Sequence, residues 1–184
     1  MAYRLIAERG LEGFRFADVA REAGINNGTL LYYFPSKDAL VQAVGAYLVE
    51  QFSEPMLHPD PDADGAENAL AELRREFDDA RLRLHQRVGV VFTELLVRAQ
   101  RDPSVAALMR EIEASWCEWL VTLLERGRAS GQLRADIDVD LVASAIMSAI
   151  LGVGMQALIR GSPSGGEPLM DAFADLISAW VAAA

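Results

Sequence analysis

Helix-forming residues run along this chain in long blocks, and no stretch alternates β-branched with polar residues as a strand does. The 7 prolines and 14 glycines, which would interrupt a helix, are gathered in a few places. With 184 residues, 52% of them hydrophobic, the chain can bury a substantial core, which excludes disordered, collagen-like and disulfide-stapled proteins. The sequence therefore predicts an all-α protein of about nine helices.

The clearest break in the chain is the segment 53–65, which holds three prolines and three aspartates. A connector helix is expected before it, because Ser36 is a natural N-cap and apolar residues recur from there to Phe52. Three short helices are expected earlier, at 2–9, 16–23 and 27–34. Five longer helices are expected to begin near Asp64, Gln86, Asp102, Asp138 and Pro168. The predicted domains are a helical head, residues 1–52, and a larger helical domain, residues 53–184.

Residues 16–30 have the spacing of a helix-turn-helix. Ala20 is small where two helices would cross, and Gly24 can adopt the positive φ that a tight turn requires. Three apolar side chains would fill the wedge between the helices: Val19, Ile25 and Leu30. The side chains left on the outer face suit phosphates and base edges: Asn26, Asn27, Thr29, Tyr32 and Tyr33. An ordinary helical hairpin with a polar outer face is the alternative.

Three segments, 10–14 (GLEGF), 18–25 (DVAREAGI) and 28–40 (GTLLYYFPSKDAL), resemble the DNA-binding domain of the tetracycline-repressor (TetR) family. The resemblance covers roughly the first 44 residues. It implies a three-helix DNA-binding head joined to a ligand-binding and dimerisation domain, and a repressor of a palindromic operator that a small-molecule effector releases. It also implies that Arg15 and Lys37 contact phosphate.

The net charge of the chain argues against tight binding to DNA. The chain has a formal net charge of −10, and its first 52 residues hold five basic and six acidic residues. The family often has lysine where this chain has Asn27, and tyrosine where it has Leu31. Such a head is expected to bind DNA weakly. The alternative function is an effector-free helical dimeric interaction protein with a weakened DNA-binding head.

Aromatic, leucine and methionine side chains of the larger domain suit an apolar pocket, and the resemblance to TetR proteins favours one there. The predicted contacts of a small apolar or amphipathic effector are Phe92, Leu96, Met109, Trp116, Trp119, Leu120 and Met147. The alternative is that these side chains form only core.

The last two helices are the predicted dimer interface, because a palindrome reader needs two recognition helices about 34–36 Å apart. Two apolar stripes carry the prediction: Ile146, Ile150, Val153 and Ala157, then Leu169, Phe173, Leu176 and Trp180. Packing of both stripes inside one subunit is the alternative.

No residue set suggests catalysis, a cofactor or a metal site. Residues 60–65 imitate the start of a calcium-binding loop, but Ala71 stands where the closing glutamate is required. Residues 152–157 spell a loose dinucleotide fingerprint inside a helical pattern, where it cannot cradle pyrophosphate. The two histidines and Cys117 lack the spacing of metal ligands. The chain is expected to be a regulator rather than an enzyme.

Residues 141–159 carry no charge over 19 positions, which is the length of a membrane span. Aspartates rather than basic residues precede them, so a helix buried in a bundle or dimer is expected and no membrane partner. The single cysteine and the absence of an apolar signal sequence at residues 1–10 predict a cytoplasmic protein.

Overall fold

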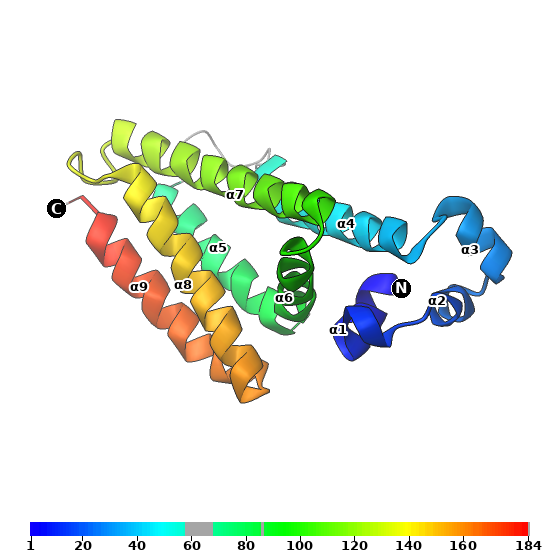
Figure 1. Cartoon of the computed structure of the whole chain (residues 1–184). Helices are drawn as coiled ribbons and strands as arrows, with labels where there is room; N and C mark the ends of the chain where they lie inside the picture. Colours follow the sequence, from blue (N-terminus) through cyan, green and yellow to red (C-terminus); the bar gives the residue numbers. More distant parts are fainter. Residues whose placement is uncertain (58–67, 86, 184) are drawn as a thin grey trace. The chain divides into compact units, whose positions relative to one another are not determined.

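The structure is a computed structural model that describes residues 1–57, 68–85 and 87–183. The described residues contain nine α-helices and no strand, which confirms the predicted all-α class (Figure 1). The helices are α1 (Ala2–Gly13), α2 (Phe16–Ala23), α3 (Asn27–Tyr33), α4 (Lys37–Leu57), α5 (Ala69–His85), α6 (Val88–Ala99), α7 (Pro103–Ala129), α8 (Val139–Arg160) and α9 (Glu167–Val181). A 3-10 turn, Pro163–Gly165, lies between the last two. The calcium-like motif at 60–65 and the helix starts expected at Asp64 and Gln86 lie outside the described residues.

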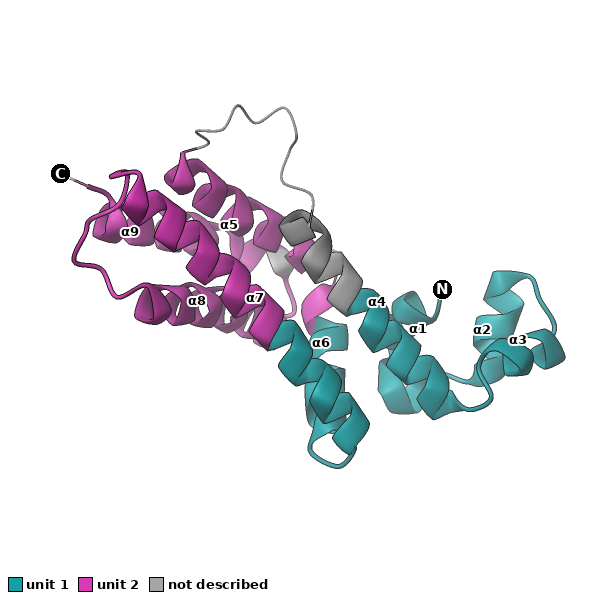
Figure 2. Cartoon of the chain, turned by 90° about the horizontal axis from the view of Figure 1, so that it is seen from above, with its two compact units in different colours: residues 1–54, 90–113 teal, residues 55–89, 114–184 magenta. Residues whose placement is uncertain are grey.

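The chain divides into two compact units (Figure 2). Unit 1 comprises residues 1–54 and 90–113, and unit 2 comprises residues 55–89 and 114–184. The predicted domains 1–52 and 53–184 differ from this grouping in where they place residues 90–113. They stay a prediction of how the chain divides functionally.

The helix-turn-helix of unit 1 is built as its local sequence requires. Gly24 closes α2 in the left-handed conformation, with φ 68° and ψ 24°, and its N–H donates to the last turn of the helix. Val19, Ala20 and Leu30 are buried where the two helices meet. The prediction that Ile25 fills the same wedge is wrong: Ile25 follows the turn directly and its side chain is exposed.

Helix α1 bends at Gly10, whose φ of 73° and ψ of 170° are not helical. The sequence predicted that the first helix ends there. Instead the helix resumes with Leu11, which is buried, and continues to Gly13. The backbone conformation at Gly10 is one that only glycine adopts readily, so this residue permits the bend.

Unit 2 is a bundle in which α5, α8 and α9 contact one another and the second half of α7 completes the core. Its fully buried side chains include Leu73, Leu120, Leu123, Ile146 and Met170. Both ends of α8 are set by capping residues. Asp138 accepts a hydrogen bond from the Leu141 N–H at 3.0 Å, and Gly161 ends the helix with φ 65°.

Among the described helices, α8 is the one with the length and apolar character to cross a membrane, with a mean hydropathy of 1.9. Eight of its residues are buried in unit 2. A core helix of a bundle has this composition.

Candidate nucleic-acid interface and ligand site

The outer face of α3 is aromatic and apolar. Tyr32 is 83% exposed and Tyr33 is 67% exposed, and their rings meet edge to face with centroids 5.2 Å apart. Leu31 is 49% exposed, whereas Leu30 beside it is buried in the head. Large side chains on a seven-residue helix are therefore presented outward, where a partner can cover them.

Asn26 and Thr29 organise the start of α3. The Thr29 N–H donates to Asn26 Oδ1 at 2.8 Å, and the Thr29 hydroxyl donates to the same oxygen at 3.2 Å. Asn26 is thus the N-cap of the helix, and its amide oxygen is engaged within the protein. Asn27, at the first position of the helix, is exposed.

Lys37 is held against the loop between α1 and α2. Its Nζ donates to the carbonyl oxygen of Phe14 at 3.2 Å and lies 4.4 Å from the centroid of the Phe14 ring. An ammonium group has three donors, so this contact orients the side chain without using up its hydrogen-bonding capacity. Lys37 can therefore contact a phosphate at the start of α4.

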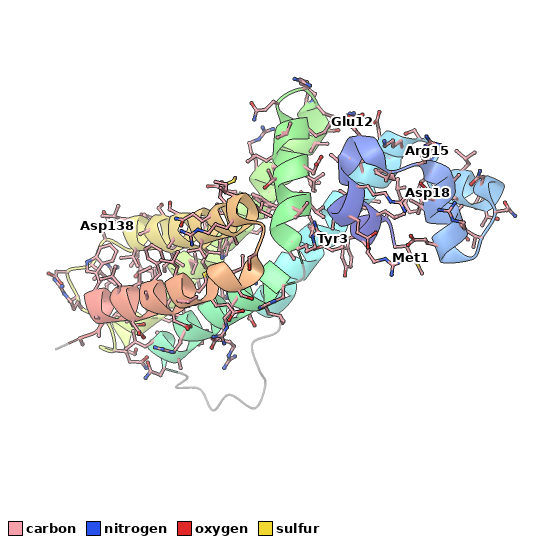
Figure 3. All side chains as sticks on the ribbon, turned by 90° about the horizontal axis from the view of Figure 1, so that it is seen from below. Met1, Tyr3, Glu12, Arg15, Asp18 and Asp138 are labelled. Carbon is pink, nitrogen blue, oxygen red and sulfur yellow. The ribbon has the colours of Figure 1, made fainter. Side chains whose placement is uncertain are left out.

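The arginines of the head differ in what they contact. Arg9 and Arg21 both pair with Asp18, at 3.0 and 2.6 Å, and Arg4 pairs with Glu22. The hydrogen bond from Arg21 is the largest cause that lowers the pKa of Asp18. Arg15, at the N-cap position of α2 and labelled in Figure 3, is exposed and forms no ion pair among the described residues.

Three side-chain contacts within unit 1 join the head to α6 and the start of α7. Glu94 accepts a hydrogen bond from the Leu11 N–H at 3.1 Å, where α1 resumes after its bend. Arg98 donates to Asp38 at 2.8 Å, and Gln42 donates to Ser104 at 2.7 Å. These pairs could not be predicted from the sequence, because their members are 60 to 83 positions apart and no local pattern relates them.

The predicted effector contacts are distributed over both units. Unit 1 holds Phe92, Leu96 and Met109, and unit 2 holds Trp116, Trp119, Leu120 and Met147. Met109, Trp116, Leu120 and Met147 are buried, Phe92 and Trp119 are half-buried, and Leu96 is exposed. A cavity of about 330 Å³ at the turn between α6 and α7 is lined by other residues, from Ala99 to Arg110. Effector contact by the predicted residues stays a prediction.

A buried ion pair lies beside Trp116, one of the predicted effector contacts. Glu76 of α5 is 5% exposed and accepts a hydrogen bond from Arg83 at 2.6 Å. Burial raises the pKa of Glu76, while the Arg83 guanidinium and the Trp116 indole oppose the rise. The described residues contain no cluster of metal ligands. The burial of Glu76 could not be predicted from the sequence, since nothing in a charged helix shows which carboxylate turns inward.

The two predicted interface stripes have different surroundings. Ile146, Ile150, Val153 and Ala157 are all buried in the core of unit 2, which was the alternative for this stripe. The opposite face of α8 carries the exposed apolar side chains Leu141, Leu151, Met155 and Ile159. On α9, Leu176 and Trp180 are exposed, while Leu169 and Phe173 pack partly against the core.

Comparison with known proteins gives matches over nearly the whole chain. The family model described as bacterial regulatory proteins, tetR family, matches residues 1–44, and one described as the tetracyclin repressor-like C-terminal domain matches residues 60–179. The HTH-type transcriptional repressor KstR2 of Rhodococcus jostii is 31% identical over 146 residues, which are 77% of this chain and 68% of that protein.

Solved structures of transcriptional regulators have a similar fold over nearly the whole chain. A transcriptional regulator from Saccharomonospora viridis, in complex with choline, is 25% identical with a TM-score of 0.78, covering 95% of this chain and 91% of that one. A TetR transcription regulator from Haloarcula marismortui is 19% identical with a TM-score of 0.85, covering 98% and 94%.

Proposed function

The chain belongs to the tetR family of bacterial regulatory proteins, and we propose that it represses transcription as a homodimer on a palindromic operator. The observation that carries this proposal is the exposed face of α3, the second helix of a helix-turn-helix whose first helix, α2, is closed by Gly24. In such heads the second helix enters the major groove and its neighbours contact the backbone. Lys37 and Arg15 are the proposed phosphate contacts, and Thr29, Tyr32 and Tyr33 the proposed contacts from α3.

The experiment is a gel shift with the DNA upstream of the gene, at two salt concentrations. We expect Lys37→Ala to weaken all sequences about equally and Tyr33→Ala to weaken the operator most, because phosphate contacts carry no sequence information. Tyr33→Phe is the matched control, since it keeps the ring and removes only the hydroxyl. Unchanged operator affinity in both alanine variants would refute the assignment.

We propose the exposed faces of α8 and α9 as the dimer interface. Leu141, Leu151, Met155 and Ile159 of α8 share this surface with Leu176 and Trp180 of α9, and the two helices contact each other. Ser144, Ser148 and Gly152, exposed on the same face of α8, permit a second helix to approach closely. An exposed apolar patch on adjacent helices suits a symmetric four-helix contact between two copies.

Charge insertion tests this interface. Ile159 is 78% exposed and Leu176 is 63% exposed, so Ile159→Arg and Leu176→Glu should leave the fold intact and give monomers in light scattering after size exclusion. Val153→Arg is the contrasting variant, because it places a charge in the subunit core and should unfold the protein instead. Stable dimers of both exposed-face variants would place the interface elsewhere.

A small apolar or amphipathic effector is the proposed inducer, shifting the dimer toward a state whose two heads no longer match adjacent major grooves. The S. viridis relative in complex with choline supports a ligand-binding role for this domain. The candidate contacts are those predicted above, with Trp116 and Trp119 as fluorescent reporters. A compound that binds should change tryptophan emission and release DNA together, by linkage. A cytoplasmic location is proposed with this function.

One observation favours the alternative of a helical dimer with a weakened head. Three arginines of the head, Arg4, Arg9 and Arg21, already pair with carboxylates of the head. Phosphates must compete with these carboxylates, which lowers the electrostatic contribution to binding. The gel shift at low salt distinguishes the two functions, because the alternative predicts no complex with the upstream DNA.

A further inference from the structure

The recognition helix and its flanks carry no charged side chain. From Gly24 to Ser36 every residue is apolar, aromatic, amide, hydroxyl or glycine. The commonest specific contact in the major groove is a bidentate arginine or lysine on guanine O6 and N7. Helix α3 has no such group to offer, so direct reading of guanine by a cation from this helix is excluded.

Two side chains of α3 are suited to a different base pair. Asn27 and Leu31 are four positions apart, so they lie on the same face of the helix, and both are exposed. An asparagine amide pairs bidentately with adenine N6 and N7, and an apolar side chain contacts the C5 methyl group of thymine. Both groups select A·T over G·C.

Asn27 is favoured over its neighbour for the amide contact. The Asn26 amide oxygen accepts from both the Thr29 N–H and the Thr29 hydroxyl, so it is committed to capping the helix. Asn27 stands at the N-terminal end of α3, the end from which recognition helices contact base edges. Leu31 stands one turn further along the helix. Its side chain exposes apolar surface to water, which is unfavourable, and a thymine methyl group would cover that surface.

We propose that α3 reads A·T base pairs, with the Asn27 amide on adenine N6 and N7 and the Leu31 side chain on a thymine methyl group. The inference rests on the proposed function, because it requires that the head enters a major groove. It makes Leu31 a residue that determines which sequence is bound.

The test begins with selection of binding sites from random duplex DNA by the full chain. The sites obtained are then remade with deoxyuridine in place of each thymine in turn, which removes the methyl group and keeps the base pair. We expect one substitution in each half-site to weaken the wild type about fourfold, the value of one buried methyl-sized group. The same substitution should not weaken Leu31→Ala further.

A parallel series replaces each adenine with 7-deazaadenine, which lacks the N7 acceptor. One position in each half-site should weaken the wild type about fivefold or more and leave Asn27→Ala unchanged. Leu82→Ala is the matched control for Leu31→Ala, because Leu82 is a similarly exposed leucine on α5 and this variant should retain the wild-type response to every substitution.

Failure of the inference and failure of the proposed function give different results. Recovery of a specific site whose deoxyuridine and deazaadenine profiles are the same in the variants as in the wild type would overturn the reading by α3 alone. Selected half-sites with G·C at every position would also overturn it. If no sequence is enriched even at low salt, the proposed DNA binding fails and this inference fails with it.

Discussion

The buried pair between Glu76 and Arg83 predicts a stability effect that depends on pH. The side chain of Glu76 is 6% exposed and that of Arg83 is 17% exposed, so neither charge is well hydrated. Removing one partner of a buried pair costs about 3–5 kcal/mol of folding free energy, because the other charge is left in the core. For Arg83→Met we expect about 3 kcal/mol at neutral pH, the low end, since the Trp116 indole still faces the carboxylate.

The sign of the pH dependence follows from the direction of the pKa shift. Burial raises the pKa of Glu76 in the folded state above its ordinary value of 4.5. The stability that this group contributes is therefore fully present below pH 4.5 and is lost as pH rises through the folded-state pKa. Without Arg83 the pKa rises further, so the deficit of Arg83→Met should be largest at neutral pH and shrink as the solution is acidified toward pH 5.

Thermal unfolding at fixed protein concentration measures both effects, and 3 kcal/mol corresponds to a loss of about 6–12 °C in a chain of this size. The double variant Glu76→Leu with Arg83→Met should recover wild-type stability or exceed it, because apolar replacements remove the desolvation cost. Arg74→Met is the control, since Arg74 and Asp175 form an exposed pair worth at most about 1 kcal/mol. A deficit of equal size at pH 5 and pH 7.5, or a double variant as unstable as Arg83→Met, would refute the reasoning.

Two further predictions concern the head. Gly10→Ala should lower the free energy of unfolding by about 1–3 kcal/mol, because its backbone conformation favours glycine and an added Cβ would lie 2.8 Å from Glu94 Oε1. Chemical denaturation should show that Gly10→Ala costs less when it is added to Glu94→Ala, which removes the steric part and itself loses the hydrogen bond to the Leu11 N–H. No remaining cost relative to Glu94→Ala would mean that the backbone conformation costs nothing. Asp18→Asn should release Arg9 and Arg21 for phosphates, which tightens binding to random DNA and steepens its salt dependence. An unchanged slope of log affinity against log salt would show that these arginines do not face DNA.

The sequence predicted those parts of the fold that depend on neighbouring residues. Helix α2 ends at Ala23 before Gly24, as expected, α7 begins at Pro103 after its aspartate N-cap, and α8 ends before Gly161. Each of these boundaries is set by a capping residue or a positive φ within one turn of the chain. The resumption of α1 after its bend was not predictable in this way, because the Leu11 N–H is capped by Glu94 of α6, which is 83 positions away in the sequence.

The face of α8 that enters the core was beyond sequence reasoning for a different reason. Helix α8 is apolar on nearly all sides, so the stripe of Ile146 and Val153 and the stripe of Leu151 and Ile159 follow the same helical period. Periodicity shows that a side chain lies on an apolar stripe, but not whether the covering surface belongs to the same subunit. Only the positions of α5, α7 and α9 decide this, and they bury the first stripe and leave the second exposed.

The charge pattern of the head bears on how specificity arises in this protein. Non-specific affinity comes from cations that replace the counterions of phosphates, and here Arg4, Arg9 and Arg21 are neutralised by carboxylates of the same head. Under the proposed function, binding to random DNA is expected to be lowered, whereas the proposed contacts from α3 to base edges are unaffected because that helix carries no charge. Since the biologically relevant quantity is the ratio of specific to non-specific affinity, a head with a net charge near zero gains discrimination at the cost of overall strength. In the proposed function, the apolar and amide side chains of α3 would then supply most of the binding energy for the operator, so substitutions of Asn27 and Leu31 test the proposal most directly.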